Sequence, residues 1–361
     1  MKELFREITL AEFKAFTDAC VTKNYMQSPD MYNRYLKIGR KAYLFGAFSN
    51  GKLVVAGLAS VIYERFGKKI FTFSCGPLAD FSQSPEVLCS FLENCKEELK
   101  KKNGIVLQIT PYLRQADAPK DFKHALTKKA GFKYLGEYEQ VKWIYSIEFD
   151  KIADLPKQAM KSKKTPILNP QLDPELEHKL LQSFRRDHRY SIKYATSRYN
   201  LKIRELPVDE YQILYDQILE SGKFNGFVPR DVEFFRQMKD AFNDEVAAMA
   251  VETPDGLPIA AAFFILYGDE VIYLSSGFTR EYKKYGAPHL IQWTMIKYAY
   301  ANGYKKYNFW GTKPDPNNGV YQFKQGFHGE EEELVGAFAA PLNIIGRLYL
   351  AKIHTREQRD L

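Results

Sequence analysis

Two strand-like runs meet at an Asn-Gly pair in Ala42-Tyr-Leu-Phe-Gly-Ala-Phe-Ser-Asn50-Gly51-Lys-Leu-Val-Val-Ala-Gly-Leu-Ala-Ser-Val-Ile62. Asn-Gly between apolar runs predicts a tight β-hairpin, because both residues tolerate the positive φ that this turn requires. Residues 69–75 predict a third strand. Residues 86–102 then carry apolar side chains at helical spacing, and residues 105–109 form a short apolar run typical of a buried strand. The predicted order is strand, strand, strand, helix, strand.

The same order recurs in the second half of the chain. There the sequence predicts strands at 246–252, 257–267 and 270–277, a helix at 288–301 and a strand at 304–310. The hairpin turn, the end of the third strand and the end of the helix are displaced by 205, 201 and 199 residues (256 − 51, 277 − 76 and 303 − 104). This agreement indicates a duplicated α/β unit, with chance similarity of two such modules as the alternative. We predict two α/β (α+β) domains, 1–150 and 151–337, with the tail 338–361 packed back on the first.

Composition limits the class of protein. The chain has 361 residues and a net charge of +8, which is enough length for two domains and suits an anionic partner such as a tRNA, a nucleotide diphosphate or an acidic lipid. A lysine-rich protein without a special partner is the alternative. The longest uncharged runs, 256–268 and 334–346, are too short to cross a bilayer. The N-terminus lacks a secretory signal and the four cysteines show no C-x-x-C, so we expect a cytoplasmic protein with reduced thiols.

A basic segment follows the join between the two halves. Residues 157–174 are rich in Lys, Pro, Ser and Asn and predict a linker, and residues 175–199 predict one long helix. Arg185, Arg186 and Arg189 lie on neighbouring turns of that helix. They are candidate tRNA contacts because clustered cations bind phosphate backbones, and a solvated helix face is the alternative.

Several catalytic motifs are absent from the sequence, including H-E-x-x-H, G-x-S-x-G and the phosphate-binding G-x-x-x-x-G-K. The six histidines are scattered, so no metal site is expected. The strand and helix order resembles the GNAT acetyltransferase fold. The pyrophosphate turn usual in that fold is degenerate here, at Lys283-Lys-Tyr-Gly286-Ala287-Pro288, so we predict no cofactor.

A series of short motifs runs through the chain in a recognisable order. The C-terminal ones are Lys306-Tyr-Asn-Phe-Trp-Gly311, Gly319-Val-Tyr-Gln-Phe-Lys-Gln-Gly-Phe327, Val335-Gly336 and Pro341-Leu-Asn343. The earlier ones are Gln27-Ser28, Cys75-Gly-Pro-Leu78, Ile109-Thr-Pro-Tyr112 and Ala130-Gly-Phe132. Together they resemble the FemABX family of non-ribosomal peptidyltransferases over nearly the whole chain. Phe-Lys-x-Gly-Phe is the most specific motif, whereas Met31 and Tyr35 stand where the family has Trp and Lys.

The resemblance implies two GNAT-like domains in tandem, of the type without a helical arm. It implies an enzyme that takes an amino acid (Gly, Ala or Ser) from aminoacyl-tRNA, its co-substrate. The acceptor would be the side-chain amine of the third residue of a peptidoglycan stem peptide, carried either by UDP-MurNAc-pentapeptide or by a lipid-linked precursor. Such an enzyme would work in the cytoplasm, either free or in peripheral contact with the inner face of the membrane.

The resemblance also implies roles for individual residues. Lys324 would be the cation beside the reacting carbonyl, and Phe323 would shape the pocket. The candidate acceptor-binding residues are Tyr273, Arg230, Lys223 and Lys37. Two other functions stay open from the sequence: an acetyl-CoA-dependent N-acyltransferase, and a non-catalytic protein that binds tRNA or the cell-wall precursor.

Overall fold

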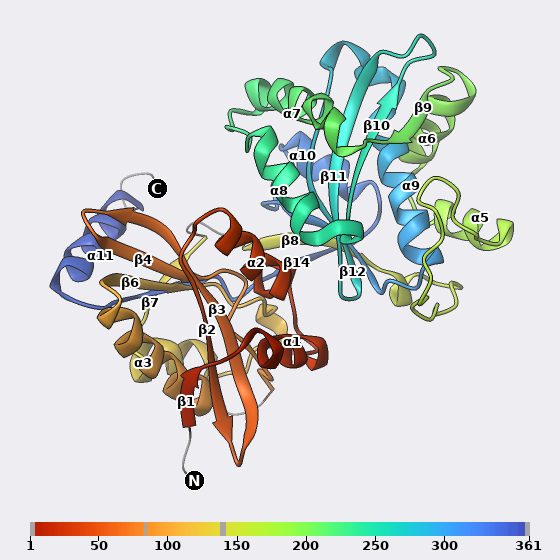
Figure 1. Cartoon of the computed structure of the whole chain (residues 1–361). Coiled ribbons are helices and arrows are strands. Elements are labelled where there is room, and N and C mark those ends of the chain that lie inside the picture. Colours follow the sequence, from red (N-terminus) through yellow and green to blue (C-terminus); the bar gives the residue numbers. More distant parts are fainter. Residues whose placement is uncertain (1–3, 83–84, 138–141, 358–361) are drawn as a thin grey trace. The chain divides into compact units, whose positions relative to one another are not determined.

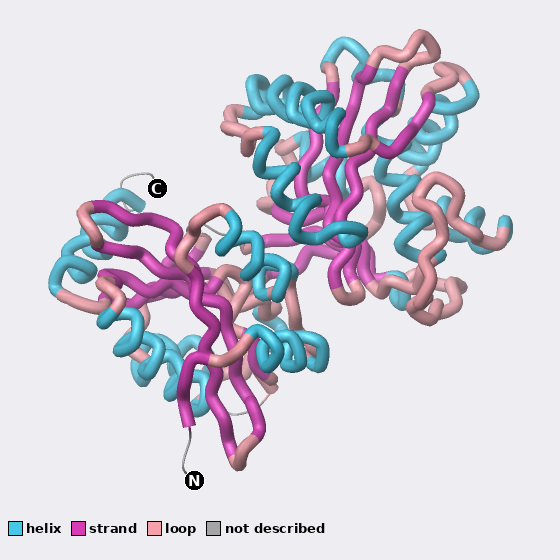
Figure 2. Tube along the Cα trace, viewed as in Figure 1, coloured by secondary structure: helices cyan, strands magenta, loops and turns pink. Residues whose placement is uncertain are grey.

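The computed structural model describes residues 4–82, 85–137 and 142–357. The chain divides into two compact units (Figure 1). The first unit comprises Met1–Lys142 with Glu332–Leu361, and the second comprises Trp143–Glu331. Within the described ranges, no helix has both the length and the apolar content needed to cross a bilayer. In each unit the strands form one sheet with helices along both of its faces (Figure 2).

The first unit is built on a mixed sheet in the order β1-β2-β3-β4-β6-β15-β7, with β5 paired to β3. Its strands are β1 (Leu4–Glu7), β2 (Ala42–Ser49), β3 (Lys52–Arg65), β4 (Lys68–Phe73), β5 (Leu78–Ala79), β6 (Gly104–Ile109), β7 (Lys133–Gly136) and β15 (Ala337–Pro341). Only β4 and β6 pair in parallel among these strands. The predicted hairpin turn joins β2 to β3, and Asn50 and Gly51 both have positive φ, 50° and 77°.

Helices cover both faces of this sheet. On one face α3 (Glu86–Lys101) buries Phe91, Leu92 and other apolar side chains against β4 and β6, as its helical spacing predicted. On the opposite face α11 (Ile344–Glu357) buries Leu350 against Ile70 and its neighbours. The remaining helical segments are α1 (Leu10–Ala19), η1 (Tyr25–Gln27), α2 (Pro29–Lys37), η2 (Gln115–Asp117), α4 (Phe122–His124) and η3 (Ala125–Lys129).

The second unit repeats this plan in a sheet of order β14-β8-β13-β12-β11-β10-β9. Its strands are β8 (Trp143–Glu148), β9 (Lys202–Glu205), β10 (Val246–Glu252), β11 (Pro258–Tyr267), β12 (Glu270–Phe278), β13 (Lys306–Gly311) and β14 (Glu330–Glu333). Strands β12 and β13 are parallel, like β4 and β6 in the first unit. Strand β8 pairs with β13, so it belongs to the second sheet although the sequence analysis placed it before the boundary at residue 150.

Helices also cover both faces of the second sheet. They are α5 (Pro174–Gln182), α6 (Arg186–Ser197), α7 (Tyr211–Asn225), α8 (Val232–Phe242), α9 (Ala287–Ala301) and α10 (Gly319–Gln325), with short turns η4 (Phe149–Lys151), η5 (Val208–Glu210), η6 (Asn243–Glu245) and η7 (Arg280–Tyr285). Helix α7 lies directly on β12, since a Cβ added at Gly277 would be 1.9 Å from the carbonyl oxygen of Gln217. Helix α9 is buried along most of its length.

The single helix predicted over residues 175–199 is wrong, because the chain breaks between α5 and α6. Phe184 is buried in the core at this break, and Arg185 has an extended backbone. The backbone N–H of Arg185 donates to the carbonyl oxygen of Gly326 (2.9 Å). A tertiary hydrogen bond therefore replaces the helical one at this position, and a helical pattern in the sequence contains no signal for it.

Candidate active site

The candidate active site lies where the parallel strands β12 and β13 of the second unit part. Their pairing covers only three positions, from Glu270 opposite Lys306 to Ile272 opposite Asn308. Both strands continue beyond this point, to Phe278 and to Gly311, but each then pairs only with its other neighbour. Beyond this point side chains take the place of the strand ladder; the Phe278 N–H, for example, donates to the Ser221 hydroxyl (3.0 Å).

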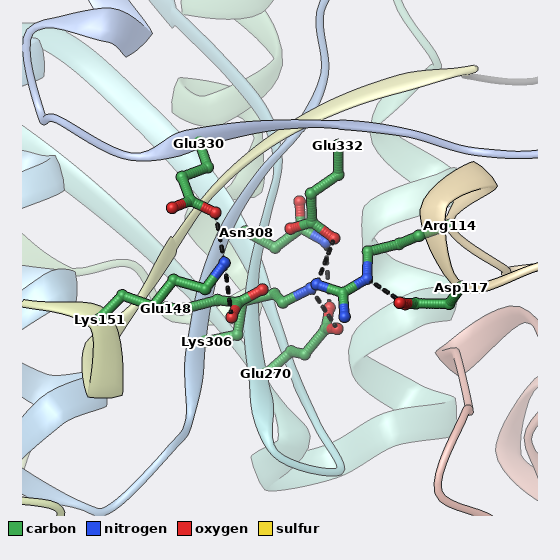
Figure 3. Close-up of polar contacts among 9 residues, drawn as sticks. All are labelled: Arg114, Asp117, Glu148, Lys151, Glu270, Lys306, Asn308, Glu330 and Glu332. Carbon is green, nitrogen blue, oxygen red and sulfur yellow. Dashed lines mark hydrogen bonds and ion pairs between the residues drawn. The ribbon is translucent and has the colours of Figure 1, made fainter.

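The end of β13 has an irregular backbone. Its register with β8 shifts between Asn308 and Gly311, and Trp310 has a φ of 58°. The side chain of Asn308 stabilises this bend by accepting a hydrogen bond from the Trp310 N–H (2.8 Å). Its amide donates in turn to Glu270 (3.0 Å), which also lies near Lys306, with 3.7 Å between the charged atoms (Figure 3). Polar contacts of Glu270 thus fix the start of the parallel pair, whereas β12 and β13 separate at its end.

Lys324 reaches this bend from helix α10. Its side chain is only 4% exposed, and its ammonium nitrogen donates to the carbonyl oxygens of Gly311 (2.5 Å) and Trp310 (3.4 Å). No carboxylate among the described residues forms an ion pair with it. Burial lowers the pKa of Lys324 to about 7, because the charged amine has lost its hydration. The side chain can therefore act either as a cation or as a proton acceptor near neutral pH.

Tyr273 is the first residue of β12 beyond the parallel pairing. Its hydroxyl forms a hydrogen bond with that of Ser276, and its ring packs on Phe264 and Phe309. Burial raises the pKa of Tyr273 to about 12, so the phenol stays protonated and can donate a hydrogen bond. Phe309 also contacts Phe327, which follows α10. Tyr273 and the motif that contains Lys324 therefore share one aromatic cluster.

Two histidines that the sequence analysis did not single out support α10. His188 on α6 forms a 2.8 Å hydrogen bond through Nε2 with the carbonyl oxygen of Phe323, and its ring lies 4.6 Å from that of His289 on α9. Burial lowers the pKa of both imidazoles, that of His289 to about 3, so both are neutral. Since a carbonyl can only accept, Nε2 of His188 carries the proton.

The packing of His188 explains the glycine in the Phe-Lys-x-Gly-Phe motif. A Cβ added at Gly326 would lie 2.0 Å from the His188 ring, so no larger residue fits without moving the helix. Phe323 is half-buried and touches both histidine rings. That glycine was the only sequence signal that could have pointed to a close neighbour, and it could not say which residue this neighbour is.

No contact among the described residues links the other predicted acceptor residues to this cluster. Lys223 and Arg230 are exposed, at the end of α7 and just before α8, and the Arg230 guanidinium stacks 4.5 Å above the Phe234 ring. Within the part of the chain that the structure describes, neither side chain forms an ion pair or hydrogen bond with the Lys324 cluster. Lys37 is exposed at the end of α2, in the first unit. Their roles in acceptor binding stay predictions.

The three arginines proposed for tRNA have different surroundings. Arg185 forms an ion pair with Asp187 (2.7 Å), and Arg189 donates to the carbonyl oxygens of Gln182 and Phe184 near the end of α5. Arg186 is exposed and contacts the Tyr190 hydroxyl (3.1 Å). Arg189 therefore has a structural use, whereas Arg186 presents its charge to solvent.

Sequence comparisons identify relatives over nearly the whole chain. The family model described as the FemAB family matches residues 8–253 and 244–346. Aminoacyltransferase FemA of Staphylococcus aureus strain MW2 is 25% identical over 402 aligned positions, which cover 94% of this chain and 95% of that protein. The protein of the same name from the bovine strain RF122 / ET3-1 is 24% identical over 403 positions, with the same coverage.

Solved structures share the fold over almost the whole chain. A crystal structure of FemX has a TM-score of 0.77 at 19% identity and covers 98% of this chain and 100% of its own. A tandem GNAT protein from the clavulanic acid biosynthesis pathway has a TM-score of 0.56 at 9% identity and covers 95% and 99%. At these identities the likeness concerns the fold alone. It confirms the predicted arrangement of two GNAT-like domains with mixed sheets flanked by helices.

Proposed function

Because the chain belongs to the FemAB family, we propose that it is an aminoacyltransferase that adds Gly, Ala or Ser from a charged tRNA to a peptidoglycan precursor. The acceptor is the side-chain amine of the third stem-peptide residue, and the product is part of an interpeptide bridge. The observation that carries this proposal is the buried Lys324 at the parting of β12 and β13, within the most specific motif of the chain.

The proposed reaction is aminolysis of an ester. The neutral acceptor amine attacks the ester carbonyl carbon, a tetrahedral oxyanion forms, and the bond to the ribose oxygen of the tRNA then breaks. The amine loses a proton and the ribose oxygen gains one, so no cofactor or metal is needed. An aminoacyl ester is already activated, so the protein must mainly place the reactants and stabilise the oxyanion.

Lys324 is proposed to stabilise that oxyanion as a cation. A negative charge beside a buried amine favours the protonated form, so the oxyanion itself would raise the pKa of Lys324 as it develops. The Gly311 and Trp310 carbonyls hold the amine in place before the substrate binds. Phe323 would shape the apolar wall, and the protonated Tyr273 would donate a hydrogen bond to the acceptor.

The charged substrates are proposed to bind through the exposed cations. Arg230 and Lys223 would contact the diphosphate of UDP-MurNAc-pentapeptide or of the lipid-linked precursor, since Arg and Lys both bind phosphate. Lys37, in the first unit, is a separate candidate for acceptor binding. The basic residues of α6, of which Arg186 is the most available, would contact the tRNA backbone. The enzyme would work in the cytoplasm, where charged tRNA is found.

The decisive experiment is transfer in a purified system. The protein is incubated with a pool of charged tRNAs and with each acceptor in turn, and the product is analysed by mass spectrometry. We expect the acceptor to gain one amino-acid residue, and Lys324→Met to lower the rate by about 10²–10³. The matched control is Lys313→Met, which removes an exposed lysine just after β13. No transfer with any tRNA, together with tight binding of coenzyme A, would favour an acetyl-CoA-dependent acyltransferase instead.

A further inference from the structure

One end of the first unit carries exposed apolar side chains that do not contribute to the core. Phe66 is 88% exposed, at the turn between β3 and β4. Ile344, Ile345 and Leu348 are 66%, 44% and 68% exposed, on the first two turns of α11. We call these four residues the apolar patch. Exposed aliphatic and aromatic side chains are common singly, but a group of four points to a surface that another body covers.

Backbone contacts bring the two parts of the patch to the same end of the sheet. The side chain of Asn343, just before α11, donates to the carbonyl oxygen of Gly104 (3.2 Å) at the start of β6. Gly104 is opposite Lys69 in the sheet, and Lys69 follows the β3–β4 turn. The first turn of α11 therefore starts beside the strand that leads out of the Phe66 turn. In Figure 1 both elements lie at the same edge of the unit.

The strand register shows which face of the sheet the residues next to Phe66 occupy. Tyr63 is directly opposite Ile70, and Ile70 packs in the cluster that contains Leu350 of α11. Side chains at opposed positions of neighbouring strands point to one face, so Tyr63 lies on the face that α11 covers. Arg65 and Lys68, the next opposed pair with this orientation, lie on that face too. Tyr63 is 49% exposed and extends the apolar surface toward the strands.

Exposed cations lie close in sequence to both parts of the apolar patch, since Arg65 and Lys68 flank the Phe66 turn and Arg347 and Lys352 are on α11. Arg65, Lys68, Arg347 and Lys352 are all exposed, and none has a carboxylate partner within the described ranges. The nearest acid along the strand, Glu64, forms an ion pair with Lys41 (3.0 Å). An apolar centre with a basic rim has the chemistry of a surface that lies on anionic lipid, where the apolar side chains enter the interface and the cations meet the headgroups.

We infer that the apolar patch docks the first unit on an anionic bilayer. The charge of the rim favours this occupant over a second copy of the chain. A symmetric dimer formed through this face would bring the four cations of each copy against those of the other, and like charges at an interface oppose association. The inference does not depend on the proposed transfer reaction, because lipid binding can be measured without it.

The test is flotation of the full-length protein with lipid vesicles. We expect binding to phosphatidylglycerol-containing vesicles and much weaker binding to pure phosphatidylcholine. Loss of one exposed cation near an anionic surface lowers the partition coefficient about fivefold, so Lys68→Gln combined with Arg347→Gln should lower it about 25-fold. Phe66→Ser combined with Leu348→Ser should lower it at least about tenfold, by removing buried apolar area.

The matched control is Val21→Ser, which changes a side chain that is 93% exposed elsewhere in the first unit. It should leave vesicle binding unchanged. All of these positions are exposed, so each variant should keep the circular dichroism spectrum of the parent. Equal binding by the parent and both double variants overturns the inference. So does a dimer in size-exclusion chromatography that the Phe66→Ser, Leu348→Ser variant dissociates, because the patch would then be covered by a second copy.

Discussion

Replacing Lys324 with methionine should stabilise the protein while it lowers the rate of the proposed transfer by about 10²–10³. The pKa of Lys324 is lowered from 10.5 to about 7 by burial, and this change corresponds to about 5 kcal/mol of destabilisation when the amine is charged. Methionine has a similar length and carries no charge. It loses the hydrogen bonds to Gly311 and Trp310, which offsets about 1–3 kcal/mol of the gain. We therefore expect Lys324→Met to be about 2–4 kcal/mol more stable at pH 6.

The pH dependence separates this effect from ordinary repacking. Below pH 7 the lysine is charged in both the folded and the unfolded protein, so the full cost of burying the charge is present. Between pH 7 and 10.5 the unfolded protein binds more protons at this site, so the stability of the parent rises by up to about 1.4 kcal/mol per pH unit. The advantage of the variant should therefore shrink by about 3 kcal/mol between pH 6 and 9.5.

Urea denaturation of parent and variant at the two pH values measures this directly. Lys313→Met, which removes an exposed lysine beyond the end of β13, is the control and should show the same small change at both pH values. A Lys324→Met variant that is less stable than the parent at pH 6 refutes the reasoning. An advantage of equal size at pH 6 and 9.5 refutes it as well, since the effect would then come from packing and not from charge.

Three further predictions concern the surroundings of α10 and the basic helix. His188→Leu should lower kcat more than it changes KM, because the hydrogen bond from His188 to Phe323 positions the helix that carries Lys324. His188→Gln keeps a hydrogen-bond donor and should retain more activity. Equal kcat values for the two variants would contradict this role. The pKa of His289 is lowered to about 3, so the unfolded protein binds more protons at this site and the stability of the parent should fall as pH drops from about 6.5 toward 3. In urea titrations over that range, His289→Leu should lose less stability than the parent. Arg186→Gln should weaken tRNA binding and reduce its dependence on salt in filter binding, whereas Arg189→Gln should mainly lower the melting temperature; the reverse pattern would reassign the two residues.

Local sequence signals predicted most of the fold because the relevant forces are local. The Asn-Gly turn and the apolar spacing over 86–102 correspond to the β2–β3 turn and to α3 (Glu86–Lys101). The helix predicted over 288–301 corresponds to α9 (Ala287–Ala301). The break between α5 and α6 could not be predicted, since it depends on a hydrogen bond from Arg185 to a residue far along the chain.

The candidate site was only partly predictable, for a related reason. The motif identified Lys324, but a lysine in a helix of seven residues gives no periodic signal of its own burial. The low pKa of Lys324 follows from its burial against the end of β13, which only the folded chain creates. His188 and His289 come from two further helices and meet only in three dimensions. Sequence reasoning therefore found the residue that carries a motif and missed those that hold it in place.

The two units differ at the equivalent point of the repeat, and this difference argues that the chemistry belongs to the second unit. In the first unit the parallel pairing of β4 and β6 runs from Lys69 to Phe73, and the Thr110 N–H extends it by donating to the carbonyl oxygen of Phe73 (3.2 Å). The Thr110 hydroxyl then accepts from the Cys75 N–H (2.8 Å), so the strands stay tied beyond their ends. In the second unit the pairing stops at Ile272, and a buried amine lies at the bend that follows. The first unit therefore ties its parallel strands together beyond their ends, whereas the second unit has the proposed catalytic lysine at the corresponding point.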